Sequence, residues 1–254
     1  MSARRVGWLG SLALLALLLA AWEAAARHSG LSALVLPAPS LVWAALANGL
    51  LSGYFWPHVR ATLSALALGL AGGSVAGLLM GMALAELPWL DRVLKPYVVL
   101  SQVLPKLALA PLFVLWFGFG LTSTAVITGL ICFFPLMENT LTGLKQADAQ
   151  RLQLFRMLGA TRLQTLLRLK LPAGLPGILA GLRVAVVLAL VGAVVGEFIG
   201  ASQGLGAVII AAQGMMDTAL MFAALAIIAV IGLALYQATL WLEARLLRAY
   251  SDPP

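Results

Sequence analysis

Long stretches without a charged residue dominate the chain. Segments 61–85 and 218–242 each contain 25 residues without a formal charge, enough for a helix to cross a bilayer with some tilt. Between Lys106 and Glu138 lie 31 uncharged residues, too many for one crossing helix and too few for two. Because residues 118–120 (Gly-Phe-Gly) are a turn signal near the middle, two spans are predicted that extend outward past both charges.

These runs predict an all-α, polytopic membrane helical bundle of about six transmembrane helices, in a single transmembrane domain covering residues 1–254. The spans are expected at residues 6–26, 59–85, 97–117, 121–143, 176–199 and 218–242. The segment 198–216 also lacks charge, but its glycines and glutamines make it a poor span. It is expected to form an external loop with a short re-entrant or interfacial helix.

The N-terminus is open to two interpretations. Arg4 and Arg5, the apolar run 6–22 and the alanines 24–26 have the three parts of a signal peptide with a small-residue cleavage site. The alternative is a retained first span. We expect retention, since a chain with several later spans does not require a cleavable signal, and the mass of the purified N-terminus would decide.

Composition excludes a water-soluble globule. The 254 residues are 62% hydrophobic and 10% charged, whereas soluble domains carry about 25% charged residues. The net charge of +7 is explained by placement in the membrane, without nucleic acid, because basic residues collect on the cytoplasmic side. With both termini in the cytoplasm, twelve basic residues lie on that side and two, Arg27 and Arg60, on the other. The single cysteine and the absence of a His/Cys cluster give no sign of a metal site.

The largest hydrophilic segment is the cytoplasmic loop 145–172, which carries six of the sixteen basic residues. An apolar stripe recurs within it in steps of three and four, as in an amphipathic helix; it comprises Leu152, Phe155, Gly159, Leu163 and Leu166. This helix is expected to be weakened at Gly159 and stopped by Pro172. Periodicity alone leaves two possibilities open, a helix on the membrane surface and a docking element for a cytoplasmic partner.

The same loop carries a motif. Its residues 153–172 resemble the loop of permease subunits of binding-protein-dependent ABC importers, whose pattern is E-A-A, three residues, G, nine residues, I-x-L-P. Further matches occur at residues 36–40 (LPAPS), 105–113 (PKLALAPLF), 133–135 (FFP), 196–198 (GEF) and 204–206 (GLG). Together they resemble the branch for nitrate, aliphatic sulfonates and taurine, which also includes permeases for pyrimidine precursors of thiamine.

The resemblance implies a type I importer permease in a bacterial inner membrane and several partners. A second permease subunit, here a homodimer, would complete the pathway, two cytoplasmic ATP-binding subunits would dock on the loops, and an external solute-binding protein would deliver the solute. The chain is not expected to be an enzyme or to hold a cofactor: it contains no Walker-type G-K-[ST] sequence, so ATP and Mg²⁺ would bind the partner ATPase. The solute would be a small anion or organic molecule, such as nitrate, a sulfonate, taurine or a pyrimidine precursor.

The resemblance also assigns a set of ATPase-coupling residues: Gln153, Phe155, Gly159, Ala160, Leu163, Leu169, Leu171 and Pro172. The chain departs from the pattern at Gln153, where the family has a glutamate that is expected to contact the ATPase. An amide keeps a hydrogen bond there but loses the charge interaction.

Three ionisable residues are candidates for the translocation pathway, because a charge at membrane depth is costly and usually faces the bundle interior or a water-filled cavity. They are Lys106, Arg183 and Glu197. Arg183 has the alternative of extending to the cytoplasmic surface, and Glu197 that of capping the external loop. A different class, a self-contained secondary transporter or channel, stays open; it predicts solute flux without an ATPase but does not explain the loop motif.

Overall fold

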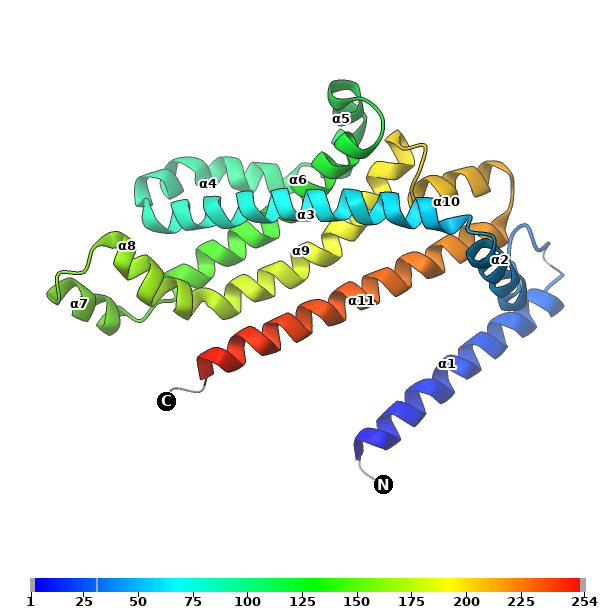
Figure 1. Ribbon diagram of the computed structural model, residues 1–254, viewed down its shortest axis with the longest axis horizontal. Coiled ribbons are helices and arrows are strands. Elements are labelled where there is room, and N and C mark those ends of the chain that lie inside the picture. Colours follow the sequence, from blue (N-terminus) through cyan, green and yellow to red (C-terminus); the bar gives the residue numbers. More distant parts are fainter. Residues whose placement is uncertain (1–2, 31, 252–254) are drawn as a thin grey trace.

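The computed structural model describes residues 3–30 and 32–251, and within these residues it is helical without a β-strand (Figure 1). The predicted all-α bundle is thus confirmed. The helices are α1 (Ala3–His28), α2 (Pro39–Leu51), α3 (Phe55–Glu86), α4 (Pro88–Val103), α5 (Ala110–Phe117), α6 (Leu121–Lys145), α7 (Ala149–Met157), α8 (Arg162–Thr165), α9 (Leu171–Gly200), α10 (Leu205–Gly214) and α11 (Thr218–Ser251). A 3-10 turn, η1 (Lys106–Leu109), precedes α5, and a π-helical turn, η2 (Leu166–Lys170), precedes α9.

Helices α3, α6 and α9 run side by side along the long axis of the molecule and form its core (Figure 1). Four glycines at four-residue steps on α3 make the approach of α6 close; they are Gly69, Gly73, Gly77 and Gly81. A Cβ added at Gly73 would overlap the carbonyl oxygen of Gly129 and lie 2.6 Å from Cys132 Sγ. The small residues therefore set the spacing of the two helices, as in other membrane bundles.

The opposite face of α6 packs on α9 in the same way. A Cβ at Gly143 would lie 2.9 Å from the carbonyl oxygen of Gly174. At this end of the bundle, Lys170 Nζ lies 2.6 Å from Glu86 Oε1, joining the start of α9 to the end of α3. Glycine contacts and this ion pair therefore hold α3, α6 and α9 close together.

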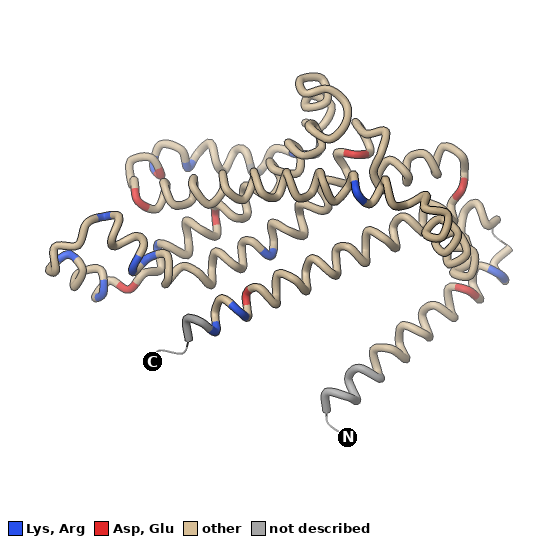
Figure 2. The backbone as a smooth tube through the Cα atoms, viewed as in Figure 1, with Lys and Arg blue, Asp and Glu red and all other residues tan. Residues whose placement is uncertain are grey.

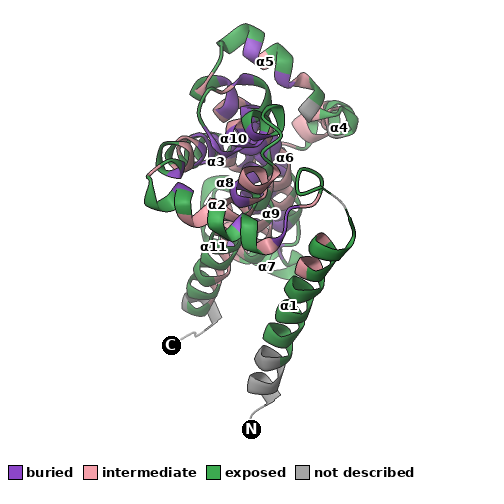
Figure 3. Ribbon diagram, turned by 90° about the vertical axis from the view of Figure 1, so that its right-hand side faces the viewer, coloured by how far each residue is buried: buried purple, intermediate pink, exposed green. Residues whose placement is uncertain are grey.

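Helices α1 and α11 lie outside this core. From Gly10 to His28 the side chains of α1 are largely exposed (Figure 3). The contact of α1 with the bundle includes Trp22, whose ring lies 5.5 Å from that of Phe222 on α11. Exposed leucines along α1, with relative exposures of 43–67% for Leu12 to Leu19, are what a lipid-facing helix presents.

Among the described residues, five helical segments are long and apolar enough to span a membrane: Gly10–His28, Phe55–Glu86, Leu121–Lys145, Arg162–Gly200 and Thr218–Arg248. The third predicted span, 97–117, is wrong as a continuous helix. It is divided into α4, η1 and α5 because Pro105 has no N–H and its ring disfavours the helical conformation at the preceding residue. Leu104 accordingly adopts an extended conformation, with ψ of 131°.

The segment 198–216, which was predicted to be an external loop, contains the short helix that was predicted for it. Helix α10 buries Leu205, Val208 and Ile209 against neighbouring helices. Its backbone is therefore covered by protein, the condition under which a short helix between spans is tolerated in a membrane.

The single amphipathic helix predicted for the loop 145–172 is not present. Gly159 has φ of +68°, and it separates α7 from α8, so the stripe is split between two helices. Pro172 does not stop a helix either, although it lies well inside a helix that begins at Arg162: the hydrogen bonding changes to the i→i+5 pattern just before the proline, which is the second residue of α9. The π-helical turn η2 leads directly into it. As a result, the chain is helical without interruption from Arg162 to Gly200.

Candidate functional site

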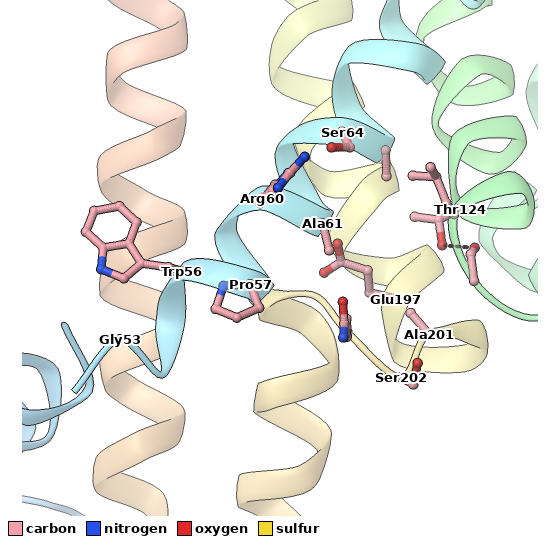
Figure 4. A pocket seen from close by; sticks show the side chains of 14 residues that line it. Gly53, Trp56, Pro57, Arg60, Ala61, Ser64, Thr124, Glu197, Ala201 and Ser202 are labelled. Carbon is pink, nitrogen blue, oxygen red and sulfur yellow. Dashed lines mark hydrogen bonds between the residues drawn. The ribbon is translucent and has the colours of Figure 1, made fainter. Parts of the chain in front are cut away.

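A cavity of about 730 Å³ lies at the end of the bundle that carries α2 and α10, among the ends of α3, α6 and α9 (Figure 4). We call it the Glu197 cavity. Its polar lining comprises Arg60 and Ser64 from α3, Thr124 from α6, Glu197 from α9, and Ser202 and Gln203 from the loop before α10. Pro57, Ala61, Ala65 and Leu121 supply apolar surface. This volume is typical of small-molecule pockets.

Glu197 is 2% exposed. Its Oε2 accepts a hydrogen bond from the backbone N–H of Gly206, at 2.8 Å, so the carboxylate holds the start of α10 against the end of α9. Its Oε1 has no hydrogen-bond partner among the described residues. The capping interaction predicted as one alternative for Glu197 is present, and the same side chain also lines the cavity.

The loop that Glu197 holds is fitted closely around the carboxylate. Gly204 has φ of +136°, and a Cβ there would overlap the Glu197 carboxyl group. The Gly204 N–H donates to His58 Nδ1 at 3.1 Å, and the Leu205 N–H donates to Thr62 Oγ1 at 2.9 Å. Three successive amides of this loop, including that of Gly206, therefore bond to side chains of α3 and α9.

Lys106 lies in a different place. Its Nζ is 4.7 Å from the ring centroid of Phe134, a distance at which a cation is attracted to the face of the ring. It lines a second cavity of about 520 Å³, the Lys106 cavity, together with Ile131, Phe134, Pro135, Glu138, Asn139, Leu188 and Val191. The helix is interrupted at Pro105, so Lys106 lies in a 3-10 turn and its side chain reaches Phe134 on α6.

Arg183 lines neither of these cavities. Its Nη2 lies 2.9 Å from Oε1 and 2.7 Å from Oε2 of Glu243 on α11. The structure thus does not bring Arg183 together with Lys106 and Glu197, and places it at a helix–helix contact instead. No spacing rule could have found this pair, because 60 residues separate its members.

The loop between α6 and α9 projects from the other end of the bundle, where the basic residues gather (Figure 2). Gln153, Gly159 and Leu163 are exposed; Phe155, Ala160, Leu171 and Pro172 are half-buried. Leu169 is 7% exposed and belongs to the core. A capping box of Thr161 and Gln164 starts α8, as expected for this pair of residue types at this spacing.

Two exposed apolar side chains in this loop were not singled out from the sequence. Met157 is 86% and Leu158 73% exposed, at the tip between α7 and α8. They do not lie at the three- and four-residue steps of the predicted stripe, and the turn at Gly159 leaves both side chains exposed. The sequence predicted for Arg60 only a position on the outer side of the membrane. Arg60 lines the Glu197 cavity because α3 packs beside the end of α9.

Comparison with known proteins gives consistent matches. A family profile described as "Binding-protein-dependent transport system inner membrane component" matches residues 73–248. The riboflavin transport system permease protein RibX of Chloroflexus aurantiacus is 41% identical, over 97% of this chain and 93% of its own length. The taurine transport system permease protein TauC of Escherichia coli is 33% identical, over 87% and 82%.

Solved structures agree at the level of the fold. An inward-facing structure of the MetNI methionine ABC transporter matches with a TM-score of 0.66 and 18% identity, covering 79% of this chain and 99% of that one. The predicted type I importer permease fold is confirmed by this match, which at such identity carries no information on the solute. On the profile and the sequence relatives, the chain belongs to the family of inner membrane permease components of binding-protein-dependent ABC transport systems.

Proposed function

We propose that this permease forms the translocation pathway of an ABC importer as a homodimer and is driven by two copies of a separate cytoplasmic ATP-binding subunit. A solute-binding protein on the outer side delivers the solute. The chain itself binds no ATP in this proposal. The observation that carries it is the uninterrupted helix from Arg162 to Gly200, which joins the projecting loop to the Glu197 cavity.

That helix offers a direct mechanical path. At about 1.5 Å per residue, the helix from Arg162 to Glu197 extends roughly 50 Å, more than the thickness of the hydrocarbon core. A displacement of α7 and α8 by the ATPase would move the far end of α9 as a rigid body. Exposed Gln153, Leu163, Met157 and Leu158 would form the contact surface, with Phe155, Ala160, Leu171 and Pro172 supporting the turn at Gly159.

The orientation proposed for the chain has both termini and the loop in the cytoplasm. The loop carries six basic residues, and basic residues near span ends favour the cytoplasmic side. The Glu197 cavity then opens toward the outer side, where the solute-binding protein docks.

For the solute, we propose a nitrogen heterocycle of the flavin or pyrimidine type. The support is the similarity to RibX and to the formylaminopyrimidine transport permease protein ThiX of Halalkalibacterium halodurans, which is 38% identical over 62% of this chain. A purely anionic solute is less well supported, because Arg183 is paired with Glu243 and Lys106 shares its cavity with Glu138.

Reconstitution tests this function. The permease is placed in proteoliposomes with the ATPase and the solute-binding protein encoded beside it, and uptake of radiolabelled riboflavin, a formylaminopyrimidine and taurine is measured. We expect uptake that requires ATP and all three components. Equal flux from the permease alone would instead establish a self-contained secondary transporter or channel.

A further inference from the structure

Lys106 and Glu138 carry opposite charges and line the same cavity, but they do not form an ion pair. Both residues line the Lys106 cavity of about 520 Å³, and the ion pairs among the described residues include neither of them. Lys106 lies instead over the ring of Phe134, with Nζ 4.7 Å from the ring centroid. Glu138 is exposed and Lys106 is half-buried, so a molecule in the cavity can reach both groups.

The cavity lies on one face of α6 at membrane depth. Its residues from α6 stand at positions i, i+3, i+4, i+7 and i+8, which share one side of a helix; they are Ile131, Phe134, Pro135, Glu138 and Asn139. Phe134 lies near the middle of α6, and Glu138 lies one helical turn nearer the end at Lys145. Charged groups inside a span are costly against lipid. We therefore expect this face to meet water or protein.

Glu138 also lines a third cavity, of about 370 Å³, at the end of the bundle from which the loop projects. This cavity is lined as well by Asp91 and Lys95 of α4 and by Lys145 of α6. Lys145 is paired with Asp91. Glu138 therefore lies where the cavity in the middle of the span adjoins the one at the loop end, and a solute that moves from one to the other passes its carboxylate.

We propose that the Lys106 cavity is a binding site for the transported solute within the permease, and that it selects a solute with an oxygen acceptor beside an N–H donor. Lys106 donates to the oxygen and Glu138 accepts the N–H. A solute of this kind satisfies both charged groups at once, which neither group does for the other in the structure. This inference rests on the proposed function, since it concerns the solute of that pathway.

Two kinds of solute share this chemistry. The imide edge of a flavin or pyrimidine presents an N–H beside carbonyl oxygens, and an amino sulfonate presents an ammonium at one end and oxygens at the other. Nitrate and simple alkyl sulfonates can accept from Lys106, but they bring negative oxygens toward the Glu138 carboxylate, which repels them. A site built to hydrogen-bond a solute N–H discriminates against analogues that lack it.

Substitutions at the two charged residues have different expected signatures. Glu138→Met removes the acceptor at similar side-chain length, and Glu138→Gln keeps an acceptor oxygen without the charge. Lys106→Met removes the donor that serves every solute with an oxygen acceptor. Asp217→Asn and Arg248→Gln are matched controls, because Asp217 and Arg248 are exposed and line neither of the two cavities that Glu138 lines.

The experiment uses the permease–ATPase complex in lipid nanodiscs without the solute-binding protein. It is titrated with riboflavin and with taurine, each beside an analogue without the N–H donor: 3-methylriboflavin and ethanesulfonate. We expect one parent solute to bind saturably and its analogue to bind about tenfold or more weakly.

Glu138→Met should weaken the parent about tenfold or more without weakening the analogue, so the ratio of their affinities falls toward one. Glu138→Gln should lie between this variant and the wild type, and it provides the same test with a smaller change in the protein. Lys106→Met should weaken parent and analogue alike and keep their ratio. Both controls should leave affinities within about threefold.

The parent that binds identifies the source of the chemistry, a heterocyclic imide or an amino sulfonate. No saturable binding of either parent, or a ratio that the Glu138 variants leave unchanged, overturns the proposal. So does loss of the dimer in both Lys106→Met and Glu138→Met, detected by native mass spectrometry, because it would assign the two charges to a contact between subunits.

Uptake by the complete reconstituted system separates this site from the function itself. ATP-driven uptake that Glu138→Met and Lys106→Met do not alter removes the site and leaves the function standing. A wild-type complex that shows no ATP-dependent uptake of any tested solute contradicts the function.

Discussion

Arg183 on α9 and Glu243 on α11 form an ion pair, with Nη2 2.7 Å from Oε2. Their side chains are 31% and 20% exposed, and both helices are long and apolar enough to span a membrane. A charge in such surroundings is retained where a partner neutralises it. The pair therefore accounts for Arg183 as a link between α11 and the core.

Removing one member of this pair is expected to destabilise the permease. Arg183→Gln leaves the Glu243 carboxylate unpaired, which should lower the free energy of unfolding by about 1–3 kcal/mol. The double variant Arg183→Gln/Glu243→Gln should recover part of that loss, because no charge is left unpaired. Thermal denaturation of the complex in nanodiscs measures both. A double variant less stable than the sum of the two single variants would contradict this account.

The contact between α3 and α6 offers a test with adjacent glycines. Gly73→Ala places a Cβ against the backbone of Gly129 and the sulfur of Cys132, so we expect a loss of about 1–3 kcal/mol. Gly72→Ala is the control, since a Cβ there meets nothing within 4 Å. It should be neutral or stabilise by about 0.5–1 kcal/mol. Thermal stability and yield after detergent extraction check the difference, and equal behaviour of the two variants would exclude close packing at Gly73.

The turn between α7 and α8 depends on the backbone at Gly159. A Cβ at this position meets nothing within 4 Å, but φ is +68°, a conformation that costs an L-residue about 1–2 kcal/mol. Gly159→Ala should therefore keep most of the transport activity. Gly159→Pro, whose φ is fixed near −65°, should insert normally yet uncouple ATP hydrolysis from uptake. Both rates are measured in the same vesicles, and normal uptake by Gly159→Pro would remove this loop as the coupling element.

Charge reversal tests whether Lys106 belongs to the pathway. Lys106→Glu would replace the cation over the Phe134 ring by an anion in a cavity that also contains Glu138. We expect uptake of the native solute to fall about tenfold or more, because the anion is repelled by both the ring face and the carboxylate. Lys106→Arg should keep most of the activity, and Arg248→Glu serves as a control on α11. Unchanged uptake by Lys106→Glu would place Lys106 outside the pathway.

The amino-acid sequence by itself determined the helical class and the family, and five of its predicted spans fall on described helices that are long and apolar enough to cross a membrane. These follow from local properties: the length of an uncharged run, the distribution of lysine and arginine, and the spacing of the motif from Gln153 to Pro172. It also located the short helix after Glu197, because glycine and glutamine cluster there.

Only the tertiary structure decided what the charged residues do. Arg183 pairs with Glu243, Lys170 with Glu86, and the Glu197 carboxylate accepts a hydrogen bond from the Gly206 amide. The partners in each pair are farther apart in the sequence than the three or four residues of one helical turn, so no helical spacing in the sequence reveals them. The continuity of the helix through Pro172 and the break at Pro105 were also decided there. A proline inside a helix removes a backbone donor and disrupts regular i→i+4 bonding. A π-helical turn precedes Pro172 and the helix continues, whereas the residue before Pro105 is extended and the helix ends.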